Sequence, residues 1–120
     1  MNTQQAFDIM VEHLRQQGRP SRDEVDGCQY RGPGGLKCAV GALIPDELYN
    51  KTLENNRIER MLTVFKHLFP QIQSVFSGID TQFLDSMQTI HDCYEPERWE
   101  SEFKLCAEEF GLNYTAPQGV

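Results

Sequence analysis

The N-terminal segment repeats apolar residues with the period of an α-helix. Its apolar positions, spaced i, i+3, i+4 and i+7, are Phe7, Met10, Val11 and Leu14. That spacing places them on one face of a helix. Asn2 with Gln5 has the form of a capping box, and Gly18 followed by Pro20 is typical of a helix end. The pattern predicts a helix with one buried face between these two signals.

Three later segments show the same period. One begins after Asn56 and ends at Pro70, one follows residues 80–81, and the last begins at Pro96 and stops at Gly111. Their apolar stripes are, in order, Ile58, Met61, Leu62, Phe65 and Phe69; Phe83, Leu84, Met87 and Ile90; and Trp99, Phe103, Cys106, Ala107 and Phe110. Three further helices are therefore predicted. Short helical turns are expected between Pro70 and the helix that follows residues 80–81.

The helical period is absent from residues 28–49, CQYRGPGGLKCAVGALIPDELY, which follow an exposed connection at residues 19–27. Residues 28–31 and 36–40 are short enough for two strands, and the Gly-Pro-Gly-Gly between them permits the positive φ values of a hairpin turn. We expect a β-hairpin at about 28–41, followed by a helical turn after Pro45. An isolated ribbon is marginal in water, so one side of it must face the helices. The expected inward side chains are Cys28, Tyr30, Leu36, Cys38 and Val40.

These elements predict a mainly α (α+β) fold of four to five helices packed with one small two-stranded β-hairpin. The 120 residues, 39% hydrophobic and 24% charged, are typical of one globular domain. We expect this domain to span residues 1–114 and residues 115–120 to form a frayed tail. No apolar run reaches the roughly 20 residues of a membrane helix or resembles a signal peptide. The sequence thus predicts a cytoplasmic protein that does not bind membranes, whose cysteines remain thiols.

The charge of the chain is −7 and is unevenly distributed. Residues 1–60 contain 8 Lys/Arg and 9 Asp/Glu, whereas residues 61–120 contain 3 and 9. Because nucleic-acid affinity depends on Lys and Arg that displace counterions, we expect no direct DNA binding. The final helix displays acidic residues that favour a basic protein partner: Glu97, Glu100, Glu102, Glu108 and Glu109.

Two kinds of chemistry are open to the cysteines and His91. A metal site would use Cys28, Cys38, His91 and Cys93, although the close pairs typical of structural zinc are missing. A thiol enzyme would use Cys38 as nucleophile and His91 as base, oriented by Asp92 or Asp46. The simpler interpretation is that the cysteines are packing residues.

The stretch RGPGGLK suggests a third possibility, a phosphate cradle. Glycine N–H groups flanked by Arg31 and Lys37 can bind an anion, and Tyr30, Tyr49 or Trp99 can stack on a base. The spacing is not that of a P-loop. The alternative is a turn whose basic side chains pair with Asp46, Glu47 or Asp92.

The chain resembles a widespread set of short bacterial, prophage and phage proteins of unknown function. The matching positions are Cys28, Tyr30, Arg31, Gly35, Lys37, Cys38, Ala39, Val40, Gly41, Leu43, Ile44, Asp46, Glu47 and Tyr49, followed by His91, Asp92 and Trp99. Met87 stands where the pattern has leucine, a swap that conserves packing. The resemblance implies a phage or mobile-element context and no particular activity.

The leading hypothesis is a non-enzymatic binding protein that sequesters or inhibits a bacterial host factor, either a defence protein or a nucleotide signal. It needs no cofactor or metal. The alternative is a thiol- or metal-dependent small enzyme using Cys38 and His91. The predicted binding residues are Tyr30, Arg31, Lys37, Asp46, Glu47, Tyr49, His91, Asp92 and Trp99. Phe69, Phe76 and Trp99 suit either a core or the interface of a homo-oligomer.

Overall fold

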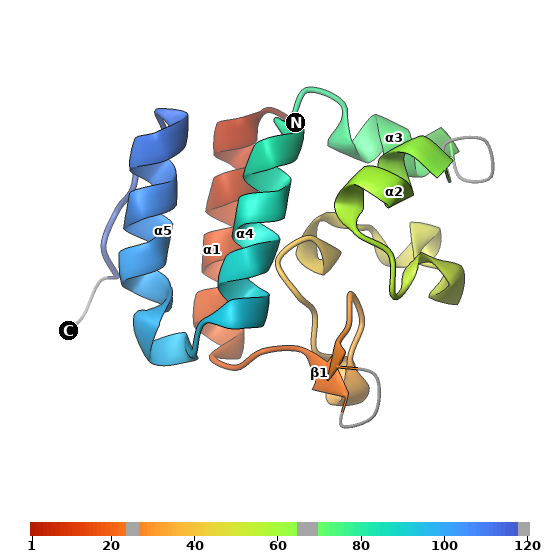
Figure 1. The fold of residues 1–120 in the computed structure, drawn as a ribbon, viewed down its shortest axis with the longest axis horizontal. Coiled ribbons are helices and arrows are strands. Elements are labelled where there is room, and N and C mark those ends of the chain that lie inside the picture. The colour runs from red at the N-terminus through yellow and green to blue at the C-terminus, as the bar shows by residue number, and fades with distance from the viewer. Residues whose placement is uncertain (24–26, 65–69, 118–120) are drawn as a thin grey trace.

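The computed structural model of the chain describes residues 1–23, 27–64 and 70–117. Three long helices, α1 (Thr3–Gln17), α4 (Thr81–Cys93) and α5 (Pro96–Phe110), lie side by side (Figure 1). Two short helices, α2 (Ile58–Val64) and α3 (Pro70–Phe76), lie beyond α4, above the irregular segment that leads from α1 to α2 (Figure 1). Among these residues, no helix is both long and apolar enough to cross a membrane.

The ends of the long helices are where the sequence signals place them. Asn2 and Gln5 form the capping box of α1, and Gly18 ends the helix with a φ of 69°. The Asp80 carboxylate caps α4, and Gly111, with a φ of 67°, ends α5. Positive φ at both glycines is the left-handed conformation that ends helices without a Cβ clash.

One hydrophobic cluster joins these helices. The ring of Phe83 on α4 packs edge-on against Phe7 of α1 and Phe110 of α5, at centroid distances of 6.2 and 5.7 Å. Phe76 and Trp99 are each 3% exposed within the same cluster. Those two side chains are therefore core residues and not part of an exposed interface, whereas Phe69 lies outside the described residues.

The second predicted helix is confirmed from Ile58 to Val64, and its expected continuation through Phe65 and Phe69 falls on residues that the structure does not describe. Pro70 opens α3, which suits a residue with no N–H to donate. The helix α2 begins two residues after Asn56, whose amide donates to the Glu54 carbonyl at 2.9 Å. Asn56 thus stabilises the preceding turn.

The fold class is confirmed, but the position of the predicted hairpin is wrong. The two-stranded antiparallel sheet pairs β1 (Arg22–Asp23) with β2 (Gly27–Cys28). In the predicted hairpin at 28–41, the described pairing is a single bridge between Arg31 and Lys37. Short 3-10 turns occupy Pro33–Gly35 and Gly41–Leu43.

Packing explains why the second predicted strand does not form. Cys38, Ala39 and Val40 are all 0% exposed, whereas successive residues of a strand point to opposite faces. Gly41 then passes so close to Tyr30 that an added Cβ would lie 2.2 Å from the Tyr30 carbonyl oxygen. The segment is therefore buried as irregular backbone. Of the five side chains expected to face inward, Tyr30, Cys38 and Val40 are buried, and Cys28 and Leu36 are half-buried.

Candidate functional site

The basic side chains of the glycine-rich segment bind the segment itself. Arg31 donates through Nη1 to the Gly41 carbonyl at 2.5 Å and through Nη2 to the Ile44 carbonyl at 2.7 Å. Asp46 accepts a further bond from Arg31 at 2.9 Å and lies 3.5 Å from Lys37 Nζ. The Arg31 side chain is only 16% exposed. Its guanidinium therefore stabilises residues 41–46 and is largely inaccessible to a ligand.

Glu54 organises the same region, and sequence reasoning missed it. Its carboxylate accepts hydrogen bonds from the backbone N–H groups of Tyr30, at 2.8 Å, and Arg31, at 3.0 Å. The Tyr49 hydroxyl donates to it at 2.6 Å. Burial, followed by this hydrogen bond, raises the pKa of Tyr49 to about 12. No motif marks Glu54, because its partners are mostly backbone groups more than 20 positions away.

The predicted stacking walls are built into this arrangement. The Arg31 guanidinium lies 5.3 Å from the centroid of the Tyr49 ring, a cation–π contact within the chain. Tyr30 is 7% exposed, and its hydroxyl donates to the Asn56 carbonyl. Burial raises the pKa of Tyr30. Of the remaining predicted contacts here, Asp46 and Glu47 are exposed.

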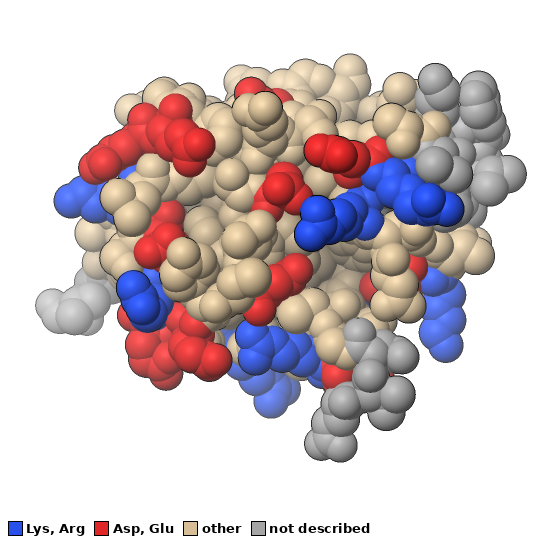
Figure 2. Space-filling view, viewed as in Figure 1, with Lys and Arg blue, Asp and Glu red and all other residues tan. Residues whose placement is uncertain are grey.

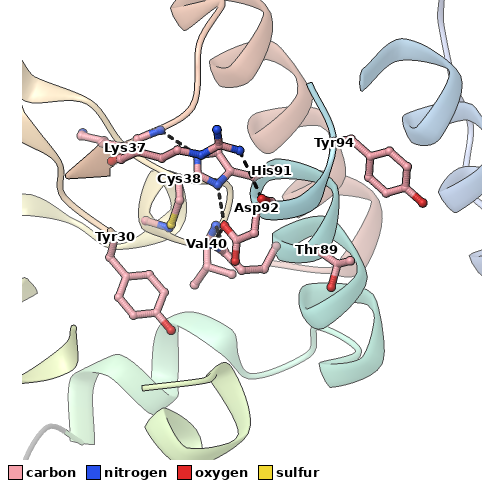
Figure 3. Close-up of polar contacts among 12 residues, drawn as sticks. Tyr30, Lys37, Cys38, Val40, Thr89, His91, Asp92 and Tyr94 are labelled. Atoms are coloured by element: carbon pink, nitrogen blue, oxygen red, sulfur yellow. Dashed lines mark hydrogen bonds and ion pairs between the residues drawn. The ribbon is translucent and has the colours of Figure 1, made fainter. Parts of the chain in front are cut away.

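His91 and Asp92 form a second, separate group at the end of α4, facing residues 38–40 (Figure 3). The Ser21 backbone N–H donates to His91 Nε2 at 2.8 Å. Because Nε2 accepts, the ring proton must be on Nδ1, which lies 2.7 Å from Asp92 Oδ1. Gln88 donates to the same Asp92 oxygen at 3.0 Å and accepts from the Val40 N–H at 3.1 Å. The network fixes the irregular segment to α4.

The His91 ring is also packed by Trp99. Their ring centroids are 6.1 Å apart with an interplanar angle of 26°. Trp99 donates from Nε1 to the Tyr94 carbonyl at 2.9 Å. His91 is 0% exposed. Trp99 and His91 therefore belong to the core, and of these three predicted binding residues only Asp92 is partly exposed.

Cys28, His91 and Asp92 bring three potential metal ligands within 4.8 Å of one another, and no other such group of three occurs in the described chain. Neither Cys38 nor Cys93 belongs to it. Burial, and then the Asp92 charge, raises the pKa of the Cys28 thiol. A metal on Nδ1 of neutral His91 would require the ring proton on Nε2, where it would meet the Ser21 N–H donor. The observed bonds suit an anchor better than a metal centre.

Cys38 is poorly suited to nucleophilic catalysis. Its side chain is 0% exposed, and burial raises the pKa of its thiol to about 12. The sulfur accepts a hydrogen bond from the Gly41 N–H at 3.2 Å. A reactive cysteine needs thiolate character and access, and His91, whose two nitrogens are both engaged, is not available as its base.

Two neighbouring depressions flank α4. The first, which we name the α4 cleft, has a volume of about 290 Å³ and is lined by Cys28, Tyr30, Glu54, Asn55, Asn56, Arg57, Ile58, Asp85, Gln88, Thr89, Asp92 and Cys93. The second, the α4–α5 groove, has about 220 Å³ and is lined by Asp85, Ser86, Thr89, Ile90, Tyr94, Glu102, Leu105, Cys106 and Glu109. Asp85 and Thr89 form the ridge between them. In the view of Figure 2, acidic side chains lie over the part of the surface that α4 and α5 form, together with a smaller number of basic ones on the α5 side.

The structure thus divides the predicted site. Arg31, Lys37, Asp46 and Tyr49 form one cluster, and Tyr30 and Asp92 reach the α4 cleft. Sequence reasoning missed Asp85 and Thr89, although their i, i+4 spacing on the polar face of the helix is a visible signal. Of the predicted acidic residues, Glu102 and Glu109 line the groove, Glu100 binds Arg15, and Glu97 and Glu108 are exposed.

No family model, curated protein or solved structure matches the chain.

Proposed function

We propose that this chain is a non-enzymatic binding protein of phage or mobile-element type that sequesters or inhibits a protein of its bacterial host in the cytoplasm. The observation that carries the proposal is a contrast between two sets of charges. Arg31 and Lys37 are both paired with Asp46, within the chain itself. The carboxylates of Asp85, Glu102 and Glu109, by comparison, form no hydrogen bond or ion pair with any residue of the described ranges. Charges that do not support the fold are the ones available to a partner.

The choice of a protein over a nucleotide signal follows from the sign of these charges. The α4 cleft is lined by Glu54, Asp85 and Asp92 and by one guanidinium, from Arg57. Carboxylates repel phosphate, whereas they attract the Lys and Arg side chains of a protein surface. A host defence protein with a basic surface fits this chemistry.

A metal-dependent enzyme is the second candidate, supported by the proximity of Cys28, His91 and Asp92. For a metal to bind Nδ1 of His91, the ring proton must move to Nε2, which now accepts a hydrogen bond from the Ser21 N–H. The metal site also requires the Cys28 thiol to ionise against a raised pKa. Both changes oppose the arrangement observed, so binding without catalysis is the better supported function.

Native mass spectrometry of the protein isolated from its bacterial host tests the proposal. We expect a complex with one host protein at fixed stoichiometry, formed equally by wild type and Cys38→Ser. Reversing the three carboxylates that lack a partner among the described residues, Asp85→Lys with Glu102→Lys and Glu109→Lys, should weaken this complex. The charge control is Asp8→Lys with Glu12→Lys and Glu59→Lys, at exposed positions that line neither the α4 cleft nor the α4–α5 groove. A chain carrying only a metal or a nucleotide, or no added mass, would contradict the proposal.

A further inference from the structure

The α4–α5 groove combines an apolar floor with an acidic rim. Ile90 and Cys106, 5% and 4% exposed, form part of its base. On α5, residues 102, 105 and 109 follow one another at i, i+3 and i+7 and therefore share a face. The middle one, Leu105, is 56% exposed. An exposed leucine between two glutamates is a feature that the core does not require.

The charge of the groove has one sign. Asp85, Glu102 and Glu109 line it, and no Lys or Arg does. The Arg98 guanidinium, which does not line the groove, lies 5.7 Å from the centroid of the Tyr94 ring, which does. Because Asp85 also lines the α4 cleft, the negative surface continues over the ridge of α4 toward Asp92.

We infer that this groove docks a basic amphipathic helix of a partner protein. The apolar side of such a helix covers Leu105 and Tyr94, and its Lys and Arg side chains reach Asp85, Glu102 and Glu109. This is the helix-in-groove mode of recognition, with charges at the rim that steer the encounter. The inference rests on the proposed function and names the surface and chemistry of its partner.

Charge selects this occupant over others. A second copy of the chain carries the same net charge of −7 and would bring like charge to an acidic groove. A nucleic acid would bring phosphates to the same carboxylates. A basic helix is the partner for which both the apolar floor and the rim are complementary.

The test uses a synthetic helical peptide with Lys and Arg on one face and Leu on the other, titrated into the ¹⁵N-labelled full chain. Two control peptides accompany it, one with Glu replacing Lys and Arg, the other with the same charges but Ser replacing Leu. We expect chemical-shift changes at Thr89, Tyr94, Leu105 and Glu109. The amphipathic basic peptide should bind at least about tenfold more tightly than either control. Its affinity should fall as NaCl rises from about 50 mM to about 500 mM.

Variants localise the interaction. Glu102→Lys with Glu109→Lys should weaken peptide binding at least about tenfold, and Leu105→Ala should weaken it about fivefold or more. The matched control, Glu12→Lys with Glu59→Lys, changes the net charge equally at exposed positions outside the groove. Equal loss in the control and the groove variant, shift changes elsewhere, or equal affinity of both basic peptides would overturn the groove assignment.

The two proposals fail separately. A host complex that the Glu102→Lys, Glu109→Lys variant still forms at full strength would overturn the groove while the binding function stands. Groove-specific peptide binding by a chain that forms no host complex would support the groove and contradict the proposed function.

Discussion

The backbone amide of Ser21 donates a hydrogen bond of 2.8 Å to Nε2 of His91, 70 positions later in the chain. Both residues are 0% exposed. The bond gives a buried N–H a buried acceptor, and it joins the segment after α1 to the last turn of α4. In the sequence, His91 and Asp92 are candidates for a metal site or a thiol enzyme. In the structure, they connect α4 to the irregular part of the fold.

Replacing His91 by Leu should destabilise the protein by about 2–4 kcal/mol, because the Ser21 N–H would be left buried without an acceptor. Urea denaturation followed by circular dichroism measures the loss. Thr89→Ala, at an exposed position of the same helix, should change the free energy of unfolding by less than about 0.5 kcal/mol. A His91→Leu loss no larger than that of the control would contradict the anchoring role.

Arg31 and Lys37 should behave differently although both contact Asp46. Arg31→Met removes the donors to the Gly41 and Ile44 carbonyls and should lower the free energy of unfolding by about 2–4 kcal/mol. Lys37→Met removes a 3.5 Å ion pair with an exposed aspartate and should lower it by less than about 1 kcal/mol. Equal losses in urea denaturation would contradict a structural role specific to Arg31.

How much the sequence could predict depends on how local each signal is. The ends of α1 and α5 follow from Asn2, Gly18 and Gly111, whose capping roles involve neighbours a few positions away. The apolar stripes located the core residues of α4 and α5 because period alone determines a helix face. These elements could therefore be predicted from the local sequence alone.

The glycine-rich segment could not be predicted in this way. Whether residues 36–40 form a strand depends on Arg31 binding the Gly41 and Ile44 carbonyls and on Glu54 binding two backbone amides. These contacts span 10 to 24 positions and leave no periodic trace. The same holds for the predicted site, because whether Arg31 meets a ligand or a carbonyl is settled by tertiary packing.

Among the four cysteines, Cys93 should react first with Ellman's reagent. It is the exposed one, whereas Cys38 and Cys106 are buried and burial raises the pKa of each of their thiols to about 12. Cys28, half-buried beside Asp92 with a raised pKa, should react slowly. We expect one fast thiol in the folded protein and four in denaturant. A fast phase that persists in Cys93→Ser would contradict this order.

The Arg15–Glu100 pair should make stability depend on pH in the acid range. Arg15 donates to both Glu100 oxygens, at 2.8 and 2.7 Å. These bonds, with one from the Tyr114 hydroxyl, hold the pKa of Glu100 below its ordinary value of 4.5. Because the folded pKa is depressed, the stabilisation is present above pH 4.5 and is lost as pH falls through the folded value.

Glu100→Gln should therefore lower Tm at neutral pH, and its Tm should converge with that of the wild type as pH falls below 4.5. Glu97→Gln, which removes an exposed carboxylate of the same helix, provides the control and should lower Tm at neutral pH less than Glu100→Gln does. A constant difference in Tm between Glu100→Gln and wild type across this range would exclude a contribution from ionised Glu100.

Ser21 and Gly32 should be energetically coupled. The Ser21 hydroxyl is buried without a hydrogen-bond partner among the described residues, so Ser21→Ala should be neutral or stabilise by up to about 1 kcal/mol. A Cβ on Gly32 would lie 2.3 Å from Ser21 Oγ, and Gly32→Ala should cost about 1–3 kcal/mol.

The cost of Gly32→Ala should shrink in the Ser21→Ala background, where the clashing oxygen is absent, giving a coupling energy above about 0.5 kcal/mol in a double-mutant cycle. Gly41→Ala is the control, because its Cβ would meet the Tyr30 carbonyl oxygen at 2.2 Å, a backbone atom that Ser21→Ala does not remove. Its cost should be the same in both backgrounds. If Gly32→Ala were equally costly with and without the hydroxyl, the close approach of Gly32 to Ser21 would not be the reason that glycine is needed there.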